Sequence, residues 1–328
     1  MPNSQYNVLI IGAGIAGLSA ARRLALAGVS SVLLDKGRGI GGRMATRRSG
    51  EAVFDHGAQY FSAKTPEFQE FVKQAATAGA LREWRPNLPD KVHPRWIGAD
   101  GMNVVPKFLG KKQHVLTGKK ALRMEPVESG WAVITEDGGR YMGNALLVTI
   151  PAPQALELLA NSNILLPESD LEALRQIAYY PCLAVLATLD RVSNIPAPGG
   201  LLPGGDVLSW MADNYQKGIS KSPSAVLHAS PAFSLAHLEG DLQVAGNQML
   251  EAAARWIAPD SIVEWQIHRW RYSLAHRRHP APFLAAAAPH PLRFGGDGFG
   301  IGNVEGAFLS GLAMAADVIN QLGTHIRA

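Results

Sequence analysis

The beginning of the chain alternates between short apolar runs and glycine-rich turns. Residues 8–11 are all apolar, which predicts a buried strand, and a second apolar run at 32–34 predicts another. Between these runs, apolar side chains recur at the spacing of one helix face, at Ile15, Leu18, Ala21 and Ala25. The first 35 residues therefore predict a strand, a helix and a second strand.

The middle of the chain predicts a helix followed by short strands. Residues 66–78 gather apolar side chains on one helix side, at Phe68, Phe71, Val72 and Ala75. The next apolar runs predict strands at 115–116, 122–124, 131–135 and 145–150, with a hairpin turn at Asp137-Gly-Gly. Pro151 and Pro153 discourage continued regular structure and mark the exit into a second lobe.

The pattern changes between about residues 154 and 284. Apolar runs predict strands at 183–189, 207–210, 225–230 and 264–270, and residues 242–257 predict an amphipathic helix. We therefore expect an antiparallel sheet with helical cover. Strand alternation places His228 opposite Leu227, and places Gln266, His268 and Trp270 opposite Trp265, Ile267 and Arg269. We expect the face with His228 and Trp270 to line a substrate cavity.

The C-terminal stretch predicts a strand, a glycine-rich turn and a helix. The strand ends at Gly296-Asp297, and the helix runs from about Val304 with Asn303 as its N-cap. Small residues would let this helix approach the sheet closely, at Gly306, Ala307, Ser310 and Gly311.

Composition narrows the class of protein. A chain of 328 residues that is 47% hydrophobic and 18% charged is long enough for two globular lobes that share one active site. The net charge of +4 is small, and basic side chains are dense only at Arg47-Arg48 and at residues 276–279, so we expect no nucleic-acid partner. The first apolar run is too short for a membrane span. A single cysteine, Cys182, excludes a multi-cysteine zinc site, and we expect no metal and a reducing, cytoplasmic location.

The turn after the first predicted strand reads G-x-G-x-x-G, from Gly12 to Gly17. Gly12 permits the tight turn, Gly14 lets backbone N–H groups approach a pyrophosphate, and Gly17 lets the helix pack close to the strand. Asp35 ends the second strand, where it can accept hydrogen bonds from a ribose. We expect a nucleotide to contact Gly12, Ala13, Gly14, Ile15, Ala16, Gly17, Asp35 and Lys36.

A second glycine-rich segment follows, Arg38-Gly-Ile-Gly-Gly-Arg43. A plain NAD-binding domain would run into a helix here. Gly41 and Gly42 would instead bring N–H groups against a second part of a long cofactor, and Arg43 would reach a phosphate. The alternative is a flexible basic loop.

These motifs, together with Phe54-Asp-His-Gly-Ala-Gln-Tyr-Phe61, interpreted as a short strand, resemble the flavin-containing amine oxidase superfamily. Within it the chain is most similar to the renalases, including their bacterial members. The segments at 94–102, 226–228 and 268–272 also resemble renalases, so the similarity touches roughly the whole chain.

The resemblance implies an α/β protein with a discontinuous Rossmann-type FAD-binding lobe and a second α+β substrate lobe built on an antiparallel sheet. It implies domains of 1–60, 100–153 and 285–328 for FAD, and of 61–99 and 154–284 for the substrate. The FAD contacts that it adds are Gly42, Arg43, Gly57, Ala58, Gln59, Ala121, Gly296, Asp297, Asn303 and Val304. The N-terminus of the last helix would then stabilise negative charge on the reduced flavin.

Two departures from the monoamine oxidases bear on the reaction. Cys182 lies far upstream of the C-terminal motif, so we expect non-covalent FAD. Asn303 stands where those enzymes place a tyrosine of their amine-binding cage, which argues against an amine oxidase.

The resemblance implies an oxidase that takes hydride from 2- and 6-dihydro isomers of NAD(P) and passes the electrons to O2, giving H2O2. We expect this nucleotide substrate to contact Gln59, Tyr60, His228, Trp270 and Trp210. The alternatives are an FAD-dependent amine oxidase or desaturase and a non-catalytic dinucleotide-binding protein. The sequence predicts no particular oligomeric state.

Overall fold

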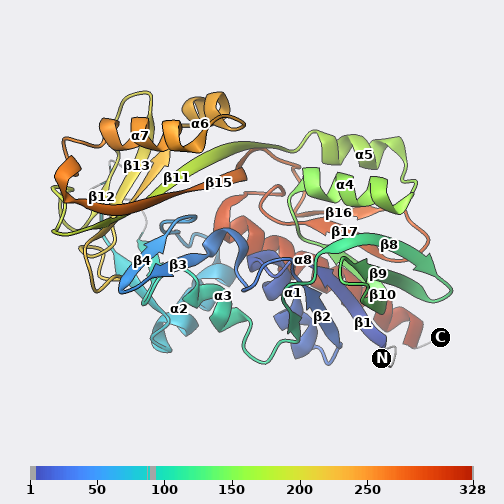
Figure 1. Ribbon diagram of the computed structural model, residues 1–328. Helices are drawn as coiled ribbons and strands as arrows, with labels where there is room; N and C mark the ends of the chain where they lie inside the picture. The colour runs from blue at the N-terminus through green and yellow to red at the C-terminus, as the bar shows by residue number, and fades with distance from the viewer. Residues whose placement is uncertain (1–4, 87, 89–93, 327–328) are drawn as a thin grey trace. The chain divides into compact units, whose positions relative to one another are not determined.

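The computed structural model describes residues 5–86, 88 and 94–326. The chain forms two compact units, each assembled from separated stretches of sequence. The first unit comprises Met1–Gly42, Pro106–Ala178 and Ala275–Ala328, and the second comprises Arg43–Val105 and Tyr179–Leu274. Figure 1 shows their elements along the chain.

The first unit is built on a largely parallel sheet. Parallel strands lie in the order β7-β2-β1-β10-β17, with β16 antiparallel beside β17, and β9 joins β8 antiparallel to β10. Val8, Leu9 and Ile10 of the central strand are wholly buried, which explains why β1 reads as a continuous apolar run. The strands are β1 (Gln5–Ile11), β2 (Ser31–Leu34), β7 (Val115–Leu116), β8 (Ala121–Val127), β9 (Gly130–Thr135), β10 (Arg140–Val148), β16 (Phe283–Ala286) and β17 (Leu292–Gly295). The predicted Rossmann-type lobe is confirmed.

Two helices of this unit, α1 (Ile15–Leu26) and α8 (Asn303–Ile326), lie side by side (Figure 1). The backbones of the two helices approach each other closely, because a Cβ at Gly311 would lie 2.1 Å from the carbonyl oxygen of Ala16. Ser19 Oγ donates to the carbonyl of Phe308 at 3.0 Å. Ser310 lies against the end of β17, where its Oγ accepts from Gly296 N–H at 2.9 Å. The small residues of α8 therefore serve both its approach to the sheet and its contact with α1.

The two prolines after β10 do not end regular structure, so that prediction was wrong. Helix α4 (Ala152–Ser162) begins directly after Pro151, its N-cap, and contains Pro153 in its first turn. Proline is tolerated there because the first N–H groups of a helix have no acceptor within the helix. Helix α5 (Glu168–Arg175) follows, and both helices belong to the first unit.

The second unit contains a sheet in the order β12-β13-β14-β11-β15. The pairs β12–β13, β13–β14 and β11–β14 are antiparallel, which confirms the predicted antiparallel sheet. Helices α6 and α7 cover one face of it (Figure 1). The elements are β11 (Ala178–Leu189), β12 (Gly200–Leu201), β13 (Leu208–Asp213), β14 (Ser224–Ala229), α6 (Pro231–His237), α7 (Leu242–Ala252), a 3-10 turn (Pro259–Ser261) and β15 (Ile262–Arg277).

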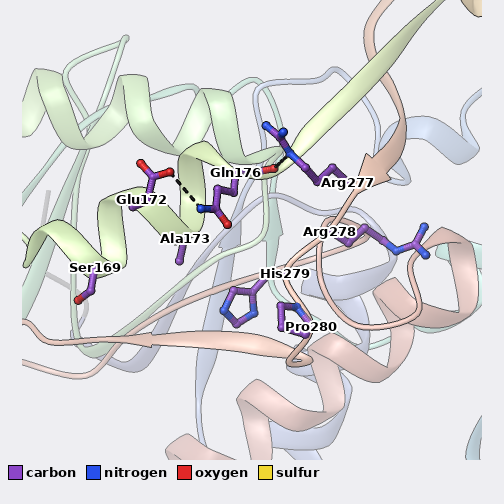
Figure 2. A pocket seen from close by; sticks show the side chains of 8 residues that line it. All are labelled: Ser169, Glu172, Ala173, Gln176, Arg277, Arg278, His279 and Pro280. Carbon is purple, nitrogen blue, oxygen red and sulfur yellow. Dashed lines mark hydrogen bonds between the residues drawn. The ribbon is translucent and has the colours of Figure 1, made fainter.

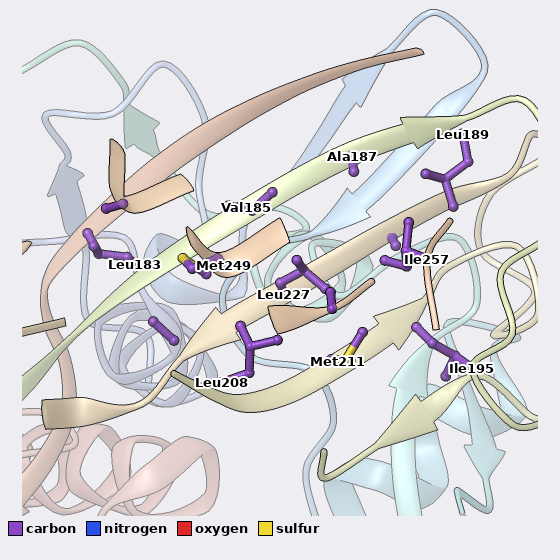
Figure 3. Close-up of a cluster of buried hydrophobic side chains, with 14 residues drawn as sticks. Leu183, Val185, Ala187, Leu189, Ile195, Leu208, Met211, Leu227, Met249 and Ile257 are labelled. Atoms are coloured by element: carbon purple, nitrogen blue, oxygen red, sulfur yellow. The ribbon is translucent and has the colours of Figure 1, made fainter. Parts of the chain in front are cut away.

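The two faces of this sheet bury different partners. Alternate residues such as Leu183, Val185 and Leu227 join Met249 of α7 in one apolar cluster (Figure 3). The intervening residues face the other way, and Ala184, Leu186 and Val226 cluster with Ala52, Phe54 and Trp270. The strand period of two residues thus separates an apolar face under α7 from a face that carries Trp270.

Among the remaining elements of the second unit, β4 (Ala52–Asp55) packs on this second face through Ala52 and Phe54. The remaining elements are a 3-10 turn (Gly42–Met44), β3 (Thr46–Ser49), β4, α2 (Pro66–Thr77), β5 (Leu81–Trp84), β6 (Arg95–Gly98) and α3 (Val104–Leu109), and the first and last of these cross into the first unit. The β3–β4 hairpin places residues 43–60 in the second unit, whereas α4 and α5 place 154–178 in the first. The predicted domains put 43–60 with the FAD-binding lobe and 154–178 with the substrate lobe. The units differ at these segments because strand pairing and packing between distant parts of the chain define them.

The sequence predicts a short strand from Phe54 to Phe61, but the structure has no continuous strand there. Strand β4 ends at Asp55, residues 56–60 form a loop, and Phe61 makes only an isolated bridge to Trp96. Gly57 in this loop lies against another backbone segment, because a Cβ there would stand 2.0 Å from the carbonyl oxygen of Arg43. Gly57 therefore marks a close approach outside a sheet.

Candidate active site

The turn between β1 and α1 has the shape of an anion cradle. Gly12 has φ 104°, and a Cβ at Gly17 would lie 2.1 Å from the carbonyl oxygen of Gly12, so both positions require glycine. Gly14 is the N-cap of α1, no side chain caps the helix, and no atom lies within 4 Å of where its Cβ would stand. Space is therefore open beside the N-cap of α1, whose first N–H groups have no acceptor within the helix and suit a pyrophosphate.

Asp35 holds this turn in place. Its Oδ2 accepts from Ala13 N–H at 2.6 Å and its Oδ1 accepts from Gly37 N–H at 2.7 Å. A carboxylate has about four lone-pair sites, so Asp35 retains capacity for the ribose hydroxyl that the sequence assigns to it. Lys36 beside it is exposed.

Two segments that are distant in sequence meet the same turn. Gly41 N–H donates to the Ala13 carbonyl at 2.8 Å, and a Cβ at Gly42 would lie 3.8 Å from Gly14 Cα. On the other side, Lys119 N–H donates to the Asp35 carbonyl at 2.8 Å, just before Ala121 begins β8. The structure thus brings the second glycine motif and the Ala121 segment to the nucleotide turn.

The C-terminal motif forms a second tight turn in the same unit. Gly296 has φ 129° and Asp297 is buried. Helix α8 begins at Asn303, one residue before the predicted start, and Asn303 has φ 56°, which lies outside the helical range. The first helical carbonyl acceptor is Gly302, which receives Gly306 N–H at 2.7 Å. Asn303 and Val304 remain at the helix start, where the sequence places the flavin.

In the second unit, Arg43 binds the backbone. Its Nη1 donates to the carbonyls of Tyr272 and Ser273, each at 3.2 Å, and its guanidinium lies 5.7 Å from the Tyr179 ring centroid. The Arg43 carbonyl accepts from Ala58 N–H at 2.8 Å. A phosphate contact for this side chain stays a prediction, as do FAD contacts for Gly57, Ala58 and Gln59.

The structure brings His228 and Trp270 together, as strand alternation suggested. His228 Nε2 donates to the carbonyl oxygen of His56 at 3.1 Å, and Trp270 Nε1 donates to the same oxygen at 2.8 Å. The His56 ring stacks on Trp270 at 5.2 Å between centroids, and His268 meets Trp270 edge-on at 4.4 Å. Sequence reasoning assigned no role to His56, although it directly precedes Gly57 in a motif that the resemblance singled out.

The imidazoles of this cluster are held neutral. Burial, first, and the nearby His268 and Arg47 together lower the pKa of His56 from about 6.5 to about 3. Burial likewise lowers the pKa of His228 to about 4, because the interior disfavours the charged ring. At neutral pH this cluster therefore presents aromatic surface without positive charge.

Tyr60 and Trp210 form a second aromatic group. Their ring centroids lie 5.6 Å apart, and Trp84 lies 6.1 Å from each. Trp210 pairs with His228 across β13 and β14, so this group and the imidazole cluster share the sheet. Within the described residues, the buried atoms Trp210 Nε1 and Gln59 Oε1 have no hydrogen-bond partner. Such atoms are costly to bury, which makes them candidate ligand contacts.

A buried ion pair supports the loop that carries Gln59. Lys217 and Asp55 side chains are both fully buried, with Nζ and Oδ2 at 3.1 Å. Lys217 Nζ also donates to the Gln59 carbonyl at 2.8 Å, and Asp55 Oδ1 accepts from Met102 N–H at 2.8 Å. Burial lowers the pKa of Lys217, and the Asp55 carboxylate opposes that shift. Sequence reasoning missed Lys217, because a lone lysine in a polar turn carries no periodic signal.

Among the described residues, no group of three or more His, Cys, Asp or Glu side chains is arranged to hold a metal ion. No helix there combines the length and apolar character needed to cross a membrane.

Comparison with known proteins gives relatives for both the sequence and the fold. Renalase of Mus musculus is 27% identical over 341 residues, covering 94% of this chain and 97% of that protein. Bilirubin reductase of Mediterraneibacter gnavus (strain CC55_001C) is 30% identical over 144 residues, covering 43% of this chain and 22% of that protein. The structure of putrescine oxidase bound to putrescine superimposes with a TM-score of 0.72 at 16% identity, covering 97% of this chain and all of that one.

Family profiles match most of the chain. Residues 10–75 match an NAD(P)-binding Rossmann-like domain, which contains the glycine turn and Asp35. Residues 85–319 match the flavin containing amine oxidoreductases. The protein is thus an FAD-dependent oxidoreductase, similar to renalase along nearly its whole length. The chain belongs to the flavin-containing amine oxidoreductase family.

Proposed function

We propose that the protein oxidises 2- and 6-dihydro isomers of NAD(P) to NAD(P)+ with dioxygen as the electron acceptor. The balanced reaction takes one dihydro isomer, one proton and O2 to NAD(P)+ and H2O2. The observation that carries this proposal is the second unit's uncharged aromatic face, where His56 and His228 stay neutral beside Trp270. Similarity to renalase supports the choice of nucleotide.

The chemistry of the substrate explains why such a face suffices. A dihydropyridine becomes an aromatic pyridinium by losing hydride alone, so no side chain must remove a proton. An amine must also be deprotonated, which calls for a base. His56 and His228 are instead committed to neutral packing, and the hydrogen bonds that His228 and Trp270 donate end on the His56 carbonyl. With pKa values of about 3 and about 4, His56 and His228 are weak bases, so we assign them to shaping and orienting the site.

The first unit supplies the contacts expected for the cofactor. The N-terminus of α1 would bind the pyrophosphate, Asp35 the ribose, and the start of α8 would place its positive end near developing negative charge. Bound FAD supplies hydride acceptance and electron transfer to dioxygen. Gly17 and Gly311 fix these two helices by backbone contact, so the charges are placed before the substrate arrives.

The partnerless atoms of the second unit suit the substrate's carboxamide. A carboxamide carries an N–H donor and a carbonyl acceptor. Gln59 Oε1 can accept from the first and Trp210 Nε1 can donate to the second. The rings of Tyr60 and Trp210 offer flat surfaces for the pyridine.

Non-covalent attachment of FAD is part of the proposal. Cys182 is buried, and burial raises the pKa of its thiol to about 12, so the reactive thiolate is suppressed. We expect acid precipitation to leave all the yellow colour in the supernatant. Colour retained in the protein pellet would show a covalent bond.

Steady-state oxidation tests the substrate class. Oxygen uptake and H2O2 formation are measured with 2- and 6-dihydro-NAD(P) and with ordinary 4-dihydro-NAD(P). The amines compared with them are putrescine, other diamines and monoamines. We expect equal amounts of O2 consumed and H2O2 formed with the 2- and 6-isomers, and little turnover of amines. Faster turnover of an amine would favour the alternative, an amine oxidase, which the fold similarity to putrescine oxidase keeps in view.

A further inference from the structure

A cavity of about 330 Å³ lies in the first unit between α5 and the end of β15 with the residues that follow it (Figure 2). The proposed chemistry makes no use of it. Its lining consists of Ser169, Glu172, Ala173 and Gln176 on one side and Arg277, Arg278, His279 and Pro280 on the other. The second side contains most of the basic run at residues 276–279. A volume of this size matches small-ligand pockets, which begin at about 300 Å³, and exceeds what a single ion needs.

The charges around the cavity favour an anion. Arg277 is exposed, and its Nε donates to the Gln176 carbonyl, which anchors the side chain at the rim. No described residue accepts from its terminal Nη groups. Glu172 is the one carboxylate in the lining, and its Oε1 accepts from Gln176 Nε2 at 3.1 Å. The lining thus contains two arginines and one carboxylate.

The two arginines have different tasks. Arg278 donates from Nε to the Gly300 carbonyl at 3.3 Å and from Nη1 to the Ala275 carbonyl at 3.2 Å. Its side chain turns toward the start of α8 in Figure 2, whereas that of Arg277 turns toward α5. Arg278 thus fastens the backbone, and Arg277 keeps a planar pair of donors suited to a phosphate.

The basic segment is also bound to the turn before α8. His279 N–H donates to the Gly298 carbonyl at 2.9 Å, and Gly300 N–H donates to the His279 carbonyl at 2.8 Å. This turn contains Gly296 and Asp297, to which the sequence assigns flavin contacts. The cavity therefore adjoins, in the same unit, a segment of the predicted cofactor site.

We propose that this cavity binds a phosphate group of a nucleotide, with the Arg277 guanidinium as its principal donor. The identification of that nucleotide as the dinucleotide substrate rests on the proposed function. The phosphate has two sources, the pyrophosphate that NAD and NADP share and the 2′-phosphate of NADP. Arg277 would bind either by two parallel N–H bonds.

The test measures binding to the FAD-loaded protein by calorimetry, so that the cofactor site is already filled. The probes are ADP, 2′,5′-ADP, adenosine and inorganic phosphate. We expect the phosphorylated adenosines to bind, adenosine not to bind, and Arg277→Gln to weaken binding about tenfold, as expected for loss of a charge-assisted contact. Tighter binding of 2′,5′-ADP than of ADP would assign the cavity to the 2′-phosphate, and the reverse would assign it to the pyrophosphate.

Matched variants separate binding from folding. Arg140→Gln removes an exposed arginine of the same unit, paired with Glu125, and should leave every affinity unchanged. Arg277→Lys keeps the charge but loses the planar fork, and should fall between the parent and Arg277→Gln. Equal affinities in parent, Arg277→Gln and Arg140→Gln, or equal binding of adenosine and ADP, would overturn the proposal.

The outcome is independent of the oxidation assay. Arg277-dependent binding of ADP in a protein that does not oxidise dihydro-NAD(P) would keep the phosphate site and remove its assignment to that substrate. If the protein oxidises dihydro-NAD(P) but binds ADP equally well with and without Arg277, the proposed function stands and the proposed phosphate site does not.

Discussion

The nucleotide turn of the first unit and the aromatic face of the second are built by opposite means. The turn is made of backbone, because Gly12 and Gly17 bring main-chain atoms together and Asp35 bonds to main-chain N–H groups. The face is made of side chains, since Trp210, His228 and Trp270 come from three separate strands. A backbone site tolerates almost no added atom, whereas a side-chain site can lose one contact and keep its shape.

The largest effect is expected at Gly17. Its Cβ would stand 2.1 Å from the Gly12 carbonyl oxygen, so Gly17→Ala must displace the turn that faces the pyrophosphate. We expect FAD affinity to fall by about a hundredfold or more, since both the N–H groups and the helix end move away from the phosphates. Absorbance of purified protein and FAD titration give the measurement.

Gly323→Ala is the matched control for that variant. Gly323 lies in α8, and no atom stands within 4 Å of its Cβ position. It should bind FAD as the parent does. Normal FAD content in Gly17→Ala would show that the turn is not the cofactor cradle.

The second largest effect is expected at Lys217. Lys217→Met leaves the Asp55 carboxylate buried without its partner, so the free energy of unfolding should fall by about 3–5 kcal/mol. Urea denaturation of the FAD-loaded protein measures it. Adding Asp55→Leu should restore part of the loss, because both charges are then gone.

Exposed Lys221 serves as the comparison residue. Lys221→Met should change the free energy of unfolding by less than about 0.5 kcal/mol. A similarly small change in Lys217→Met would contradict the role given to the ion pair.

The neutral imidazoles make stability depend on pH. His56 and His228 have folded-state pKa values of about 3 and about 4, below the ordinary 6.5, so the unfolded chain binds more protons in acid. Their contribution to the free energy of unfolding is fully present above pH 6.5 and is lost as the pH falls toward 3. At pH 4 the loss from His56 alone is about 3 kcal/mol.

Urea denaturation between pH 4 and 7 measures this slope. His228→Gln should reduce it, and His237→Gln on α6 controls for the loss of an imidazole elsewhere. A slope that is the same in His228→Gln and the parent would show that His228 is not held neutral by its surroundings.

The smallest effect is expected at Trp210. Trp210→Phe keeps an aromatic ring but removes Nε1, the donor that has no partner within the described residues. We expect the KM for dihydro-NAD(P) to rise about fivefold to tenfold with kcat little changed, as for one lost hydrogen bond. Trp256→Phe, in the cluster under α7, is the control. An unchanged KM would remove Trp210 from the substrate site.

The contrast also explains what the sequence could predict. Glycine spacing and apolar periodicity act over a few residues, so β1, α1, β2 and the helix α2 were foreseen close to their observed bounds. Local rules failed where a residue distant in sequence sets the backbone conformation, as at Gly57, whose loop packs against Arg43. They also failed at Pro151, because proline both interrupts a helix and begins one.

The candidate site divides in the same way. Gly12, Gly14 and Asp35 carry a motif whose order alone indicates a nucleotide. The pairing of His56 with Trp270, and of Asp55 with Lys217, joins positions more than 150 residues apart, and no periodicity records it. Alternation along β14 and β15 did place His228 and Trp270 on one face, because the strand period is fixed by backbone geometry.

The central claim is that the substrate is a misreduced dihydronicotinamide. Its most direct test mixes the FAD-loaded protein anaerobically with 2- or 6-dihydro-NAD(P), or with a monoamine, and follows flavin absorbance. We expect rapid bleaching by the dihydro isomers, with NAD(P)+ formed in equal amount, and no rapid bleaching by amines. Rapid bleaching by amines alone would contradict the proposed function.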